Sequence, residues 1–314
     1  MTLNQLRYII KLHEIGGFKA AAEAIGVSQP ALSIQVQKLE QELGIAIFDR
    51  STSPISPTVD GQRFIERAQE IVTSVQRLEN FTEELSDDYD GLLRVGIIPT
   101  LAPFLIPLFT EDLQKDHPNF RLDFNEVKTE KVISGIKTGQ FDVGVISTPY
   151  DGFGINTTPL FYERFLIYSN ENQYSSQNSI DLDDIKYDSL WLLDEGNCFR
   201  DQVNNFCDLT KIRAEKHFVY RSSSIYALMR IVDTKGGTTI LPELSTLSLT
   251  EEQEENVKEI AGTPKVREIG LITRTNFDKR RFIEKLEEYI LKNIPSKMLN
   301  QQGATVVDPE IDSH

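Results

Sequence analysis

The stretch 18-FKAAAEAIGVSQPALSIQVQKLEQELGIAIFDR-50 carries two apolar stripes at helical spacing. The first stripe consists of Phe18, Ala21, Ala22 and Ile25, and Gly26 then ends its helix. Ser28 is a good N-cap for a second helix, and Pro30 suits its first turn. The second stripe consists of Leu32, Val36, Leu39 and Leu43. Two short helices joined by a Gly-Val turn, after a helix that carries Leu3, Leu6, Ile9 and Ile10, indicate a helix-turn-helix.

The face opposite the second stripe is polar apart from one isoleucine. At about 100° per residue, it carries Pro30, Ile34, Gln37 and Gln41, with Ser33 at its border and Gln29 at its exposed start. We expect this face to enter the major groove of DNA. Glutamine bonds adenine through two hydrogen bonds, and an outward Ile34 fits a thymine methyl better than water. An ordinary three-helix packing unit is the alternative interpretation.

The residues after the second helix predict a wing and a long helix. GIAIFDRSTSPISPT has an apolar strand, a polar tip and a return, and Arg50 within it is placed to meet a phosphate. From Pro57 onward, apolar residues follow alternating spacings of four and three: Phe64, Ala68, Ile71, Val75, Leu78 and Leu85, with Thr82 in the one polar slot. Such a narrow seam favours a partner helix, and hence a dimer that presents two winged helices to two DNA half-sites. The polar segment SDDYDG at 86–91 then indicates a linker.

Composition limits the class of protein. The net charge of −15 argues against nonspecific coating of nucleic acid, yet residues 1–60 are nearly neutral, with five Lys/Arg against six Asp/Glu. No apolar run is long enough to cross a bilayer, so we expect no membrane partner. Two cysteines are too few to stabilise a secreted chain of 314 residues through disulfides, so we expect a cytoplasmic protein. No zinc-site spacing, phosphate-binding loop, dinucleotide fingerprint or Ser/His/Asp arrangement occurs, so we expect neither a metal nor a cofactor.

The rest of the chain predicts an α/β architecture of two lobes. Strand-like and helix-like segments alternate from residue 92 to residue 299, which indicates βαβ units and a parallel sheet. Two crossovers, near Glu163–Phe165 and near Arg267–Ile269, resemble those of periplasmic binding proteins, whose ligands lie between the lobes. The predicted divisions are a winged helix-turn-helix at 1–58, a dimerisation helix and linker at 59–90, lobe I at 91–163 and 268–299, lobe II at 164–267, and a disordered tail at 300–314.

The segment 18–50, followed by a long linker helix, resembles the DNA-binding half of LysR-type transcriptional regulators. The resemblance continues to about residue 299, and residues 194–207 are similar to the hydrogen-peroxide-sensing OxyR branch. It implies a double-stranded DNA operator, a homodimer that pairs into a dimer of dimers, contact with RNA polymerase, an activator role and hydrogen peroxide as the signal. It also implies that the protein is not an enzyme.

The only two cysteines, Cys198 and Cys207, lie nine positions apart in DEGNCFRDQVNNFC. In one continuous helix from about 198 to 210, the thiols would be about 13 Å apart along the axis and on opposite faces. A disulfide needs Cα atoms within about 7 Å, so its formation would require this helix to unwind. We interpret the pair as a switch that a reversible disulfide operates.

The two thiols are expected to have different roles. Cys198 follows a Gly-Asn turn at a helix start, and Arg200 lies two positions on, so Cys198 is the candidate peroxide-reacting thiolate. Cys207, beside Phe206, is the candidate resolving thiol. By resemblance, Thr100 and Thr129 help to bind peroxide, although both could simply cap helices. His217 matches another family position near the site.

One residue departs from the family pattern, and other interpretations stay open. The family has histidine before the reactive cysteine, whereas this chain has Asn197, which can donate and accept hydrogen bonds but carries no charge. The thiols could be ordinary core residues, with the cleft between the lobes a receptor for a small metabolite. A thiol peroxidase that uses both cysteines is a third hypothesis, against which the helix-turn-helix counts.

Overall fold

A computed structural model describes residues 1–51, 54–84, 91–207, 222–275, 277, 279–301 and 303–311. The chain divides into two compact units, residues 1–85 and 86–314. No helix within the described ranges is long and apolar enough to span a bilayer.

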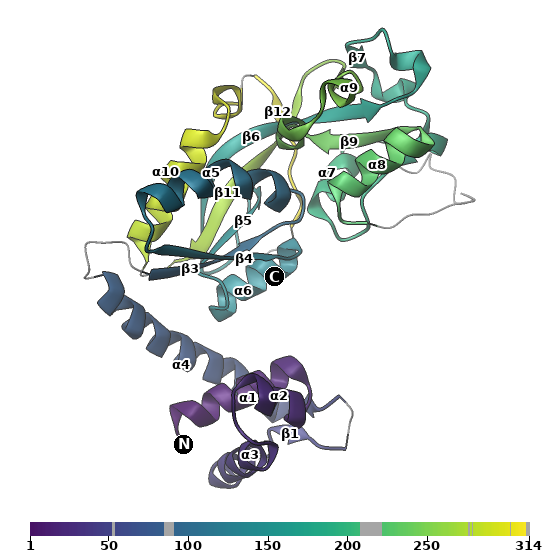
Figure 1. The fold of residues 1–314 in the computed structure, drawn as a ribbon. Helices are drawn as coiled ribbons and strands as arrows, with labels where there is room; N and C mark the ends of the chain where they lie inside the picture. The colour runs from purple at the N-terminus through teal and green to yellow at the C-terminus, as the bar shows by residue number, and fades with distance from the viewer. Residues whose placement is uncertain are drawn as a thin grey trace. The chain divides into compact units, whose positions relative to one another are not determined.

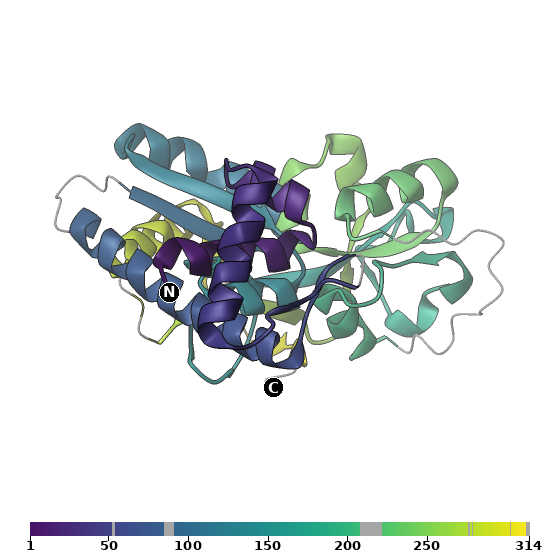
Figure 2. The ribbon, with the colours of Figure 1, turned by 90° about the horizontal axis from the view of Figure 1, so that it is seen from below.

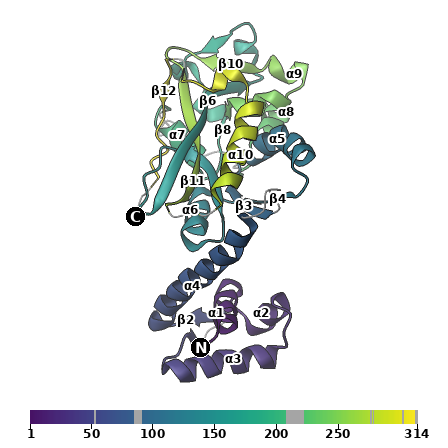
Figure 3. The same ribbon diagram turned by 90° about the vertical axis from the view of Figure 1, so that its left-hand side faces the viewer.

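The first unit contains the predicted helix-turn-helix. Helix α1 (Leu3–Ile15) starts at a capping box between Thr2 and Gln5 and precedes α2 (Phe18–Ala24). Helix α3 (Gln29–Leu43) begins where predicted, because the Ser28 hydroxyl accepts a hydrogen bond from the backbone N–H of Ala31. The apolar stripes of α1 and α3 pack together and form the core, which includes Leu6, Ile9, Leu12, Leu32, Val36 and Leu39. Figure 3 shows α3 at the edge of this unit, with one long side uncovered by the unit's other elements.

The wing is a two-stranded ribbon whose base is held by α3 and α4. Strand β1 (Phe48–Asp49) pairs antiparallel with β2 (Ser56–Pro57). Glu40 of α3 accepts hydrogen bonds from the backbone N–H groups of Ile47 (2.8 Å) and Phe48 (3.2 Å). At Gly61 of α4, a Cβ atom would lie 1.9 Å from the Ile47 carbonyl oxygen, so this close approach of two backbones requires glycine.

Helix α4 (Val59–Glu84) packs into its own unit through its first half, as far as Val72. Ile65 and Ala68 are buried in the core, whereas the side chains of Ile71 and Leu78 are 46% and 69% exposed. The predicted seam is therefore covered in its first part and open in its second. Leu85 and most of the predicted linker lie outside the described residues.

In the second unit, lobe I is a sheet with helices on both faces. The sheet contains the strands β3 (Gly91–Ile97), β4 (Phe120–Glu126), β5 (Val143–Thr148), β11 (Lys265–Arg274) and the first part of β6 (Ile155–Ser169). Helices α5 (Ala102–Asp116) and α10 (Arg280–Asn293) lie together on one face, and α6 (Thr129–Thr138) lies on the other (Figure 1). Strand β3 is parallel to β4 and β5, but β11 is antiparallel to β5 and β6, so the predicted parallel sheet is a mixed one.

Strand β6 runs through both lobes. Its residues Ile155–Arg164 pair with β11 in lobe I, and Phe165–Ser169 pair with β9 (Thr238–Pro242) in lobe II. Lobe II also contains β7 (Ser179–Ile180), β8 (Leu190–Trp191), β10 (Val257–Ile260), α7 (Cys198–Asn204), α8 (Ile225–Lys235) and α9 (Glu251–Glu254). Short 3-10 turns occupy Asn172–Tyr174, Leu182–Asp184, Tyr187–Ser189, Glu243–Ser248 and Ser296–Met298. Figure 2 shows the two lobes side by side, joined by strands.

The end of the chain corrects the prediction of a disordered tail. Strand β12 (Thr305–Val306) pairs in parallel with Lys265 and Val266 at the start of β11. Val307 is only 8% exposed, and Ile311 packs against the same core. The polar composition suggested disorder. However, the free edge at the start of β11 offers backbone hydrogen-bond partners. Burial of Val307 and packing of Ile311 add apolar contacts that stabilise this short segment. We call residues 303–311 the C-terminal strap.

Candidate functional site

Helix α3 presents the face that the sequence predicted for DNA. Gln29, Pro30, Gln37 and Gln41 are exposed, and Ser33 is half-buried. Ile34 is 61% exposed although it is apolar. A polar helix face with one outward branched residue suits the edges of bases in a major groove.

Arg50 on the wing is held by an acidic residue. Its guanidinium donates to Glu40 Oε2 at 2.8 Å and lies 5.5 Å from the centre of the Phe18 ring. The sequence predicted a phosphate contact, and the side chain remains 43% exposed. Glu40 thus fixes the position of Arg50 and offsets part of its charge.

The second candidate site begins at the turn before α7. Gly196 has a φ of 73°, a left-handed conformation that favours glycine. The Asn197 side chain then accepts a hydrogen bond at 3.1 Å from the backbone N–H of Phe199, which caps the helix. Cys198 is therefore the first residue of α7, and it is only 7% exposed.

The surroundings of Cys198 favour the protonated thiol. Burial raises the pKa of Cys198, a hydrogen bond from Thr129 and the charge of Arg267 lower it, and the net direction is upward. In this conformation burial thus opposes the thiolate that the sequence predicted, while Thr129 and Arg267 favour it. Thr129 at the start of α6 makes a side-chain hydrogen bond to Cys198, and α6 has no side-chain cap, so capping does not explain this threonine.

Arg267 connects three parts of the site. Its guanidinium is fully buried and binds Glu163 Oε1 at 2.7 Å and Thr100 Oγ1 at 2.9 Å. It also lies 4.8 Å from the centre of the Phe199 ring in α7. Glu163 is fully buried too, and it accepts a hydrogen bond from the Leu244 backbone N–H at 3.0 Å. Arg267 thus joins the start of α5, the middle of β6 and the first turn of α7.

Aromatic rings hold both ends of α7 against β6. Phe165 stacks on Phe199 with ring centres 5.2 Å apart and meets Phe206 edge-on at 5.0 Å. Cys207, next to Phe206, is 3% exposed, and burial raises its pKa to about 12. The two cysteines are free thiols at opposite ends of the helical segment.

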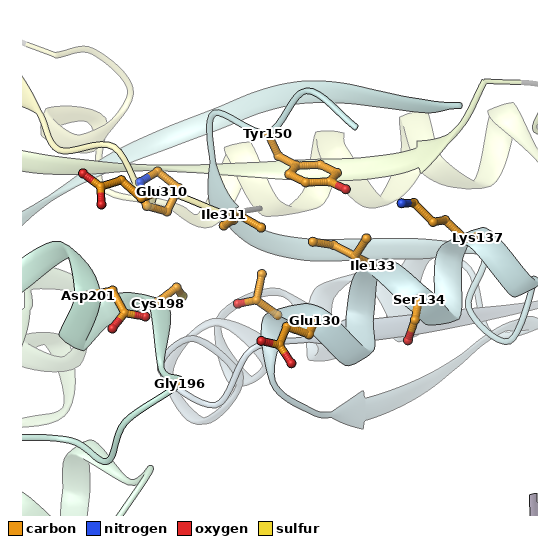
Figure 4. Close-up of a pocket in the computed structure, with 12 residues that line it drawn as sticks. Glu130, Ile133, Ser134, Lys137, Tyr150, Gly196, Cys198, Asp201, Glu310 and Ile311 are labelled. Atoms are coloured by element: carbon orange, nitrogen blue, oxygen red, sulfur yellow. The ribbon is translucent and has the colours of Figure 1, made fainter. Parts of the chain in front are cut away.

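A pocket of about 570 Å³ opens beside Cys198. Figure 4 shows Cys198 and Asp201 on one side and Glu310 and Ile311 of the strap opposite them. The other lining residues come mostly from α6 and include Thr129, Glu130, Ile133, Ser134 and Lys137. Tyr150 also lines the pocket, and its buried hydroxyl has no hydrogen-bond partner within the described part of the chain.

Both units match models of one protein family. Residues 3–62 match the bacterial regulatory helix-turn-helix protein of the lysR family, and residues 86–294 match the LysR substrate binding domain. The chain belongs to the LysR family of transcriptional regulators. It is therefore a DNA-binding regulator of transcription, and its family is not a family of enzymes.

Relatives of this LysR-type regulator include peroxide regulators. It is 28% identical to the DNA-binding transcriptional dual regulator OxyR of Escherichia coli, over 92% of this chain and 95% of the relative. It is 31% identical to the transcriptional regulator EstR of Acinetobacter baylyi, over 87% and 90% of the two chains. A full-length OxyR variant from Pseudomonas aeruginosa has a similar structure, with a TM-score of 0.73, 31% identity and coverage of 92% and 94%.

The site of this LysR-type regulator brings together only some of the predicted residues. Thr129 and Asn197 lie beside Cys198, and Thr100 is linked to α7 through Arg267. Arg200 instead donates to the Leu193 carbonyl at 2.8 Å, so the cation that acts on the thiol is Arg267. His217 and residues 208–210 of the predicted long helix lie outside the described residues, and α7 itself ends at Asn204.

Sequence reasoning missed Arg267 and Gln202. Gln202 is fully buried in α7, accepts a hydrogen bond from Ser147 Oγ at 3.2 Å and donates to the Val307 carbonyl at 2.6 Å. A signal for Arg267 was available, because FYERFLIYS and KVREIGLITR each place a charged residue inside an apolar strand. Buried charges need partners of opposite sign, which points to the pair Glu163–Arg267.

Proposed function

We propose that this LysR-type regulator senses hydrogen peroxide through a reversible disulfide between Cys198 and Cys207. The observation that carries the proposal is the pair of buried free thiols at the two ends of the α7 segment, one of them bound by Thr129 and near Arg267. Similarity to proteins named as hydrogen peroxide-inducible genes activators supports it. A hydrogen-peroxide-bound OxyR mutant of Corynebacterium glutamicum, with a TM-score of 0.58 and 25% identity, has a related structure.

The chemistry balances in two steps. The Cys198 thiol first loses its proton, and the resulting thiolate attacks one peroxide oxygen. The O–O bond breaks, the leaving hydroxide takes up the released proton to become water, and a sulfenic acid remains at Cys198. The Cys207 thiol then attacks the Cys198 sulfur, a disulfide forms, and the sulfenic hydroxyl leaves as a second water. Peroxide is thereby reduced, and the two thiols are oxidised.

The second step requires α7 to unwind. The seven residues Cys198–Asn204 form a helix that rises about 1.5 Å per residue, so its ends are about 10 Å apart. Cys207 follows the helix, and its backbone N–H is bonded to the Val203 carbonyl at 2.9 Å. Because a disulfide needs Cα atoms within about 7 Å, the helix and its aromatic contacts with Phe165 must open.

The proposal is tested by mapping the cysteines after a low dose of peroxide. We expect a Cys198–Cys207 disulfide in the treated full-length chain and a changed footprint on operator DNA. Peroxide that leaves both thiols free would contradict the proposal.

A small metabolite as the signal is the second candidate function. The pocket of about 570 Å³ far exceeds a peroxide molecule, since a water occupies roughly 30 Å³ in the liquid. Polar side chains such as Ser134, Lys137 and Asp201 line it and suit a polar ligand. A redox-insensitive thermal shift with a metabolite would favour this function over peroxide sensing.

For DNA binding, we propose that Gln29, Ser33, Ile34 and Gln37 read bases, that Pro30 packs beside them, and that Arg50 contacts a phosphate. Gln37→Ala should weaken operator binding by roughly 1–3 kcal/mol and leave binding to random DNA nearly unchanged. Arg50→Ala is the matched contrast, because loss of a phosphate contact should weaken both and reduce the salt dependence. Fluorescence anisotropy at two salt concentrations measures these effects. Equal losses on both DNAs after Gln37→Ala would contradict base reading.

We further propose that the open part of α4 forms the dimer interface, and that two such dimers pair into a dimer of dimers. A buried Ile or Leu side chain contributes roughly 1.5–3 kcal/mol, so Ile71→Glu combined with Leu78→Glu should give monomers in light scattering. Glu66→Lys, an exposed change on the opposite face of α4, should leave the mass unchanged. A dimer that survives the paired substitution would exclude this interface.

A further inference from the structure

The C-terminal strap is hydrogen-bonded to the start of strand β11. The Thr305 N–H donates to the Pro264 carbonyl and the Val307 N–H donates to the Val266 carbonyl, each at 2.8 Å. Val307 is buried in the core, so the strap begins as an extra strand beside β11.

Beyond β12, the strap is held by α7. Gln202 donates to the Val307 carbonyl at 2.6 Å, and Asn205 donates to the Asp308 carbonyl at 3.2 Å. Both side chains belong to the segment between the two cysteines, and both acceptors are backbone atoms of the strap. These bonds therefore depend on α7 keeping its helical conformation.

The distal part of the strap forms one wall of the Cys198 pocket. Pro309, Glu310 and Ile311 line it, and Figure 4 shows Glu310 and Ile311 across from Cys198 and Asp201. Glu310 has a φ of 50°, a left-handed conformation that a non-glycine residue keeps only when contacts hold it. Its N–H donates to Asp308 Oδ1 at 2.8 Å, which is one such contact.

We propose that the C-terminal strap is an intramolecular lock that stabilises the reduced form of α7 and must release α7 before the disulfide closes. The proposal rests on the proposed disulfide switch. When α7 unwinds, Gln202 and Asn205 leave the strap carbonyls, so the strap stabilises the dithiol form more than the disulfide form. By linkage, the strap shifts the dithiol–disulfide equilibrium toward the dithiol.

Three variants of the full chain test the lock. A chain that ends at residue 302 lacks the strap. Asn205→Ala removes one bond to it, and Asn204→Ala changes the adjacent exposed asparagine, which makes no bond to the described residues 303–311 of the strap. Each is equilibrated in a glutathione redox buffer, and the disulfide is quantified by mass mapping. We expect the disulfide equilibrium constant to rise about tenfold without the strap and about two- to fivefold in Asn205→Ala, with no change in Asn204→Ala.

Melting temperatures separate a lock from a merely structural segment. Asn205→Ala should lower the melting temperature of the reduced protein and leave that of the oxidised protein unchanged. Equal lowering of both, or an unchanged disulfide constant, overturns the lock while the parent chain still forms its disulfide. If the parent chain forms no disulfide at all, the switch itself fails and the lock fails with it. Should the truncated chain not fold, Asn205→Ala still decides.

Discussion

Replacing Cys198 with serine should abolish every response of the protein to peroxide. A hydroxyl is not oxidised by peroxide under these conditions, so no sulfenic acid and no disulfide can form. Cys207 is poorly suited to replace the lost thiol, because it is 3% exposed and burial raises its pKa to about 12. The expected result is an operator footprint that is identical with and without peroxide.

Cys207→Ser is the matched control for this experiment. It keeps the peroxide-reacting thiol, so a sulfenic acid at Cys198 should be detectable by dimedone labelling, but the conformation should not lock and the footprint should not change. A peroxide-dependent footprint in Cys198→Ser would refute the sensor and favour the metabolite-receptor alternative.

Arg267→Met should be the most destabilising substitution near the site. It leaves the fully buried Glu163 carboxylate without its cation, and breaking a buried ion pair in this way costs about 3–5 kcal/mol. It also leaves Thr100 Oγ1 without its donor and removes the cation over the Phe199 ring. Urea unfolding of the reduced protein should show a loss of this size.

A double substitution separates the charge from the packing. Arg267→Met combined with Glu163→Gln removes both charges and keeps an acceptor for the Leu244 N–H, so it should regain most of the lost stability. Its Cys198 should nevertheless react more slowly with peroxide, because Arg267 no longer lowers the thiol pKa. A double variant as unstable as the single one would show that shape, and not charge, decides the cost.

The DNA-binding unit could be predicted almost element by element. Its helices are fixed by local signals, such as the Ser28 cap and the stripe from Leu32 to Leu39, which operate within one or two turns. The polar face of α3 followed from the same periodicity. The alternation of strand-like and helix-like segments also predicted a two-lobed α/β domain after the linker, and its strands and helices lie close to the predicted segments.

The details of the thiol site could not be predicted, because they depend on contacts between distant segments. Arg267 meets Thr100 across 167 positions, and Gln202 meets Val307 across 105. Burial by such distant segments is the main cause of the raised pKa of Cys198, whereas the neighbouring Arg200 is bonded to the Leu193 carbonyl. The strap is ordered by its hydrogen bonds to β11 and α7, and its own polar composition gives no sign of this order.

Strand β6 determines what kind of movement can report the oxidation. One unbroken backbone serves both lobes, paired with β11 before Arg164 and with β9 after it, and the ion pair of Glu163 and Arg267 lies at the change of partner. Hinge closure of two lobes needs loops that absorb large changes of φ and ψ. Here a rotation of one lobe against the other would have to bend β6, which is hydrogen-bonded to neighbouring strands in both lobes. If Cys198 and Cys207 form the proposed disulfide, we therefore expect the change of shape to be greatest around α7 in lobe II, rather than to be a rotation of one lobe against the other.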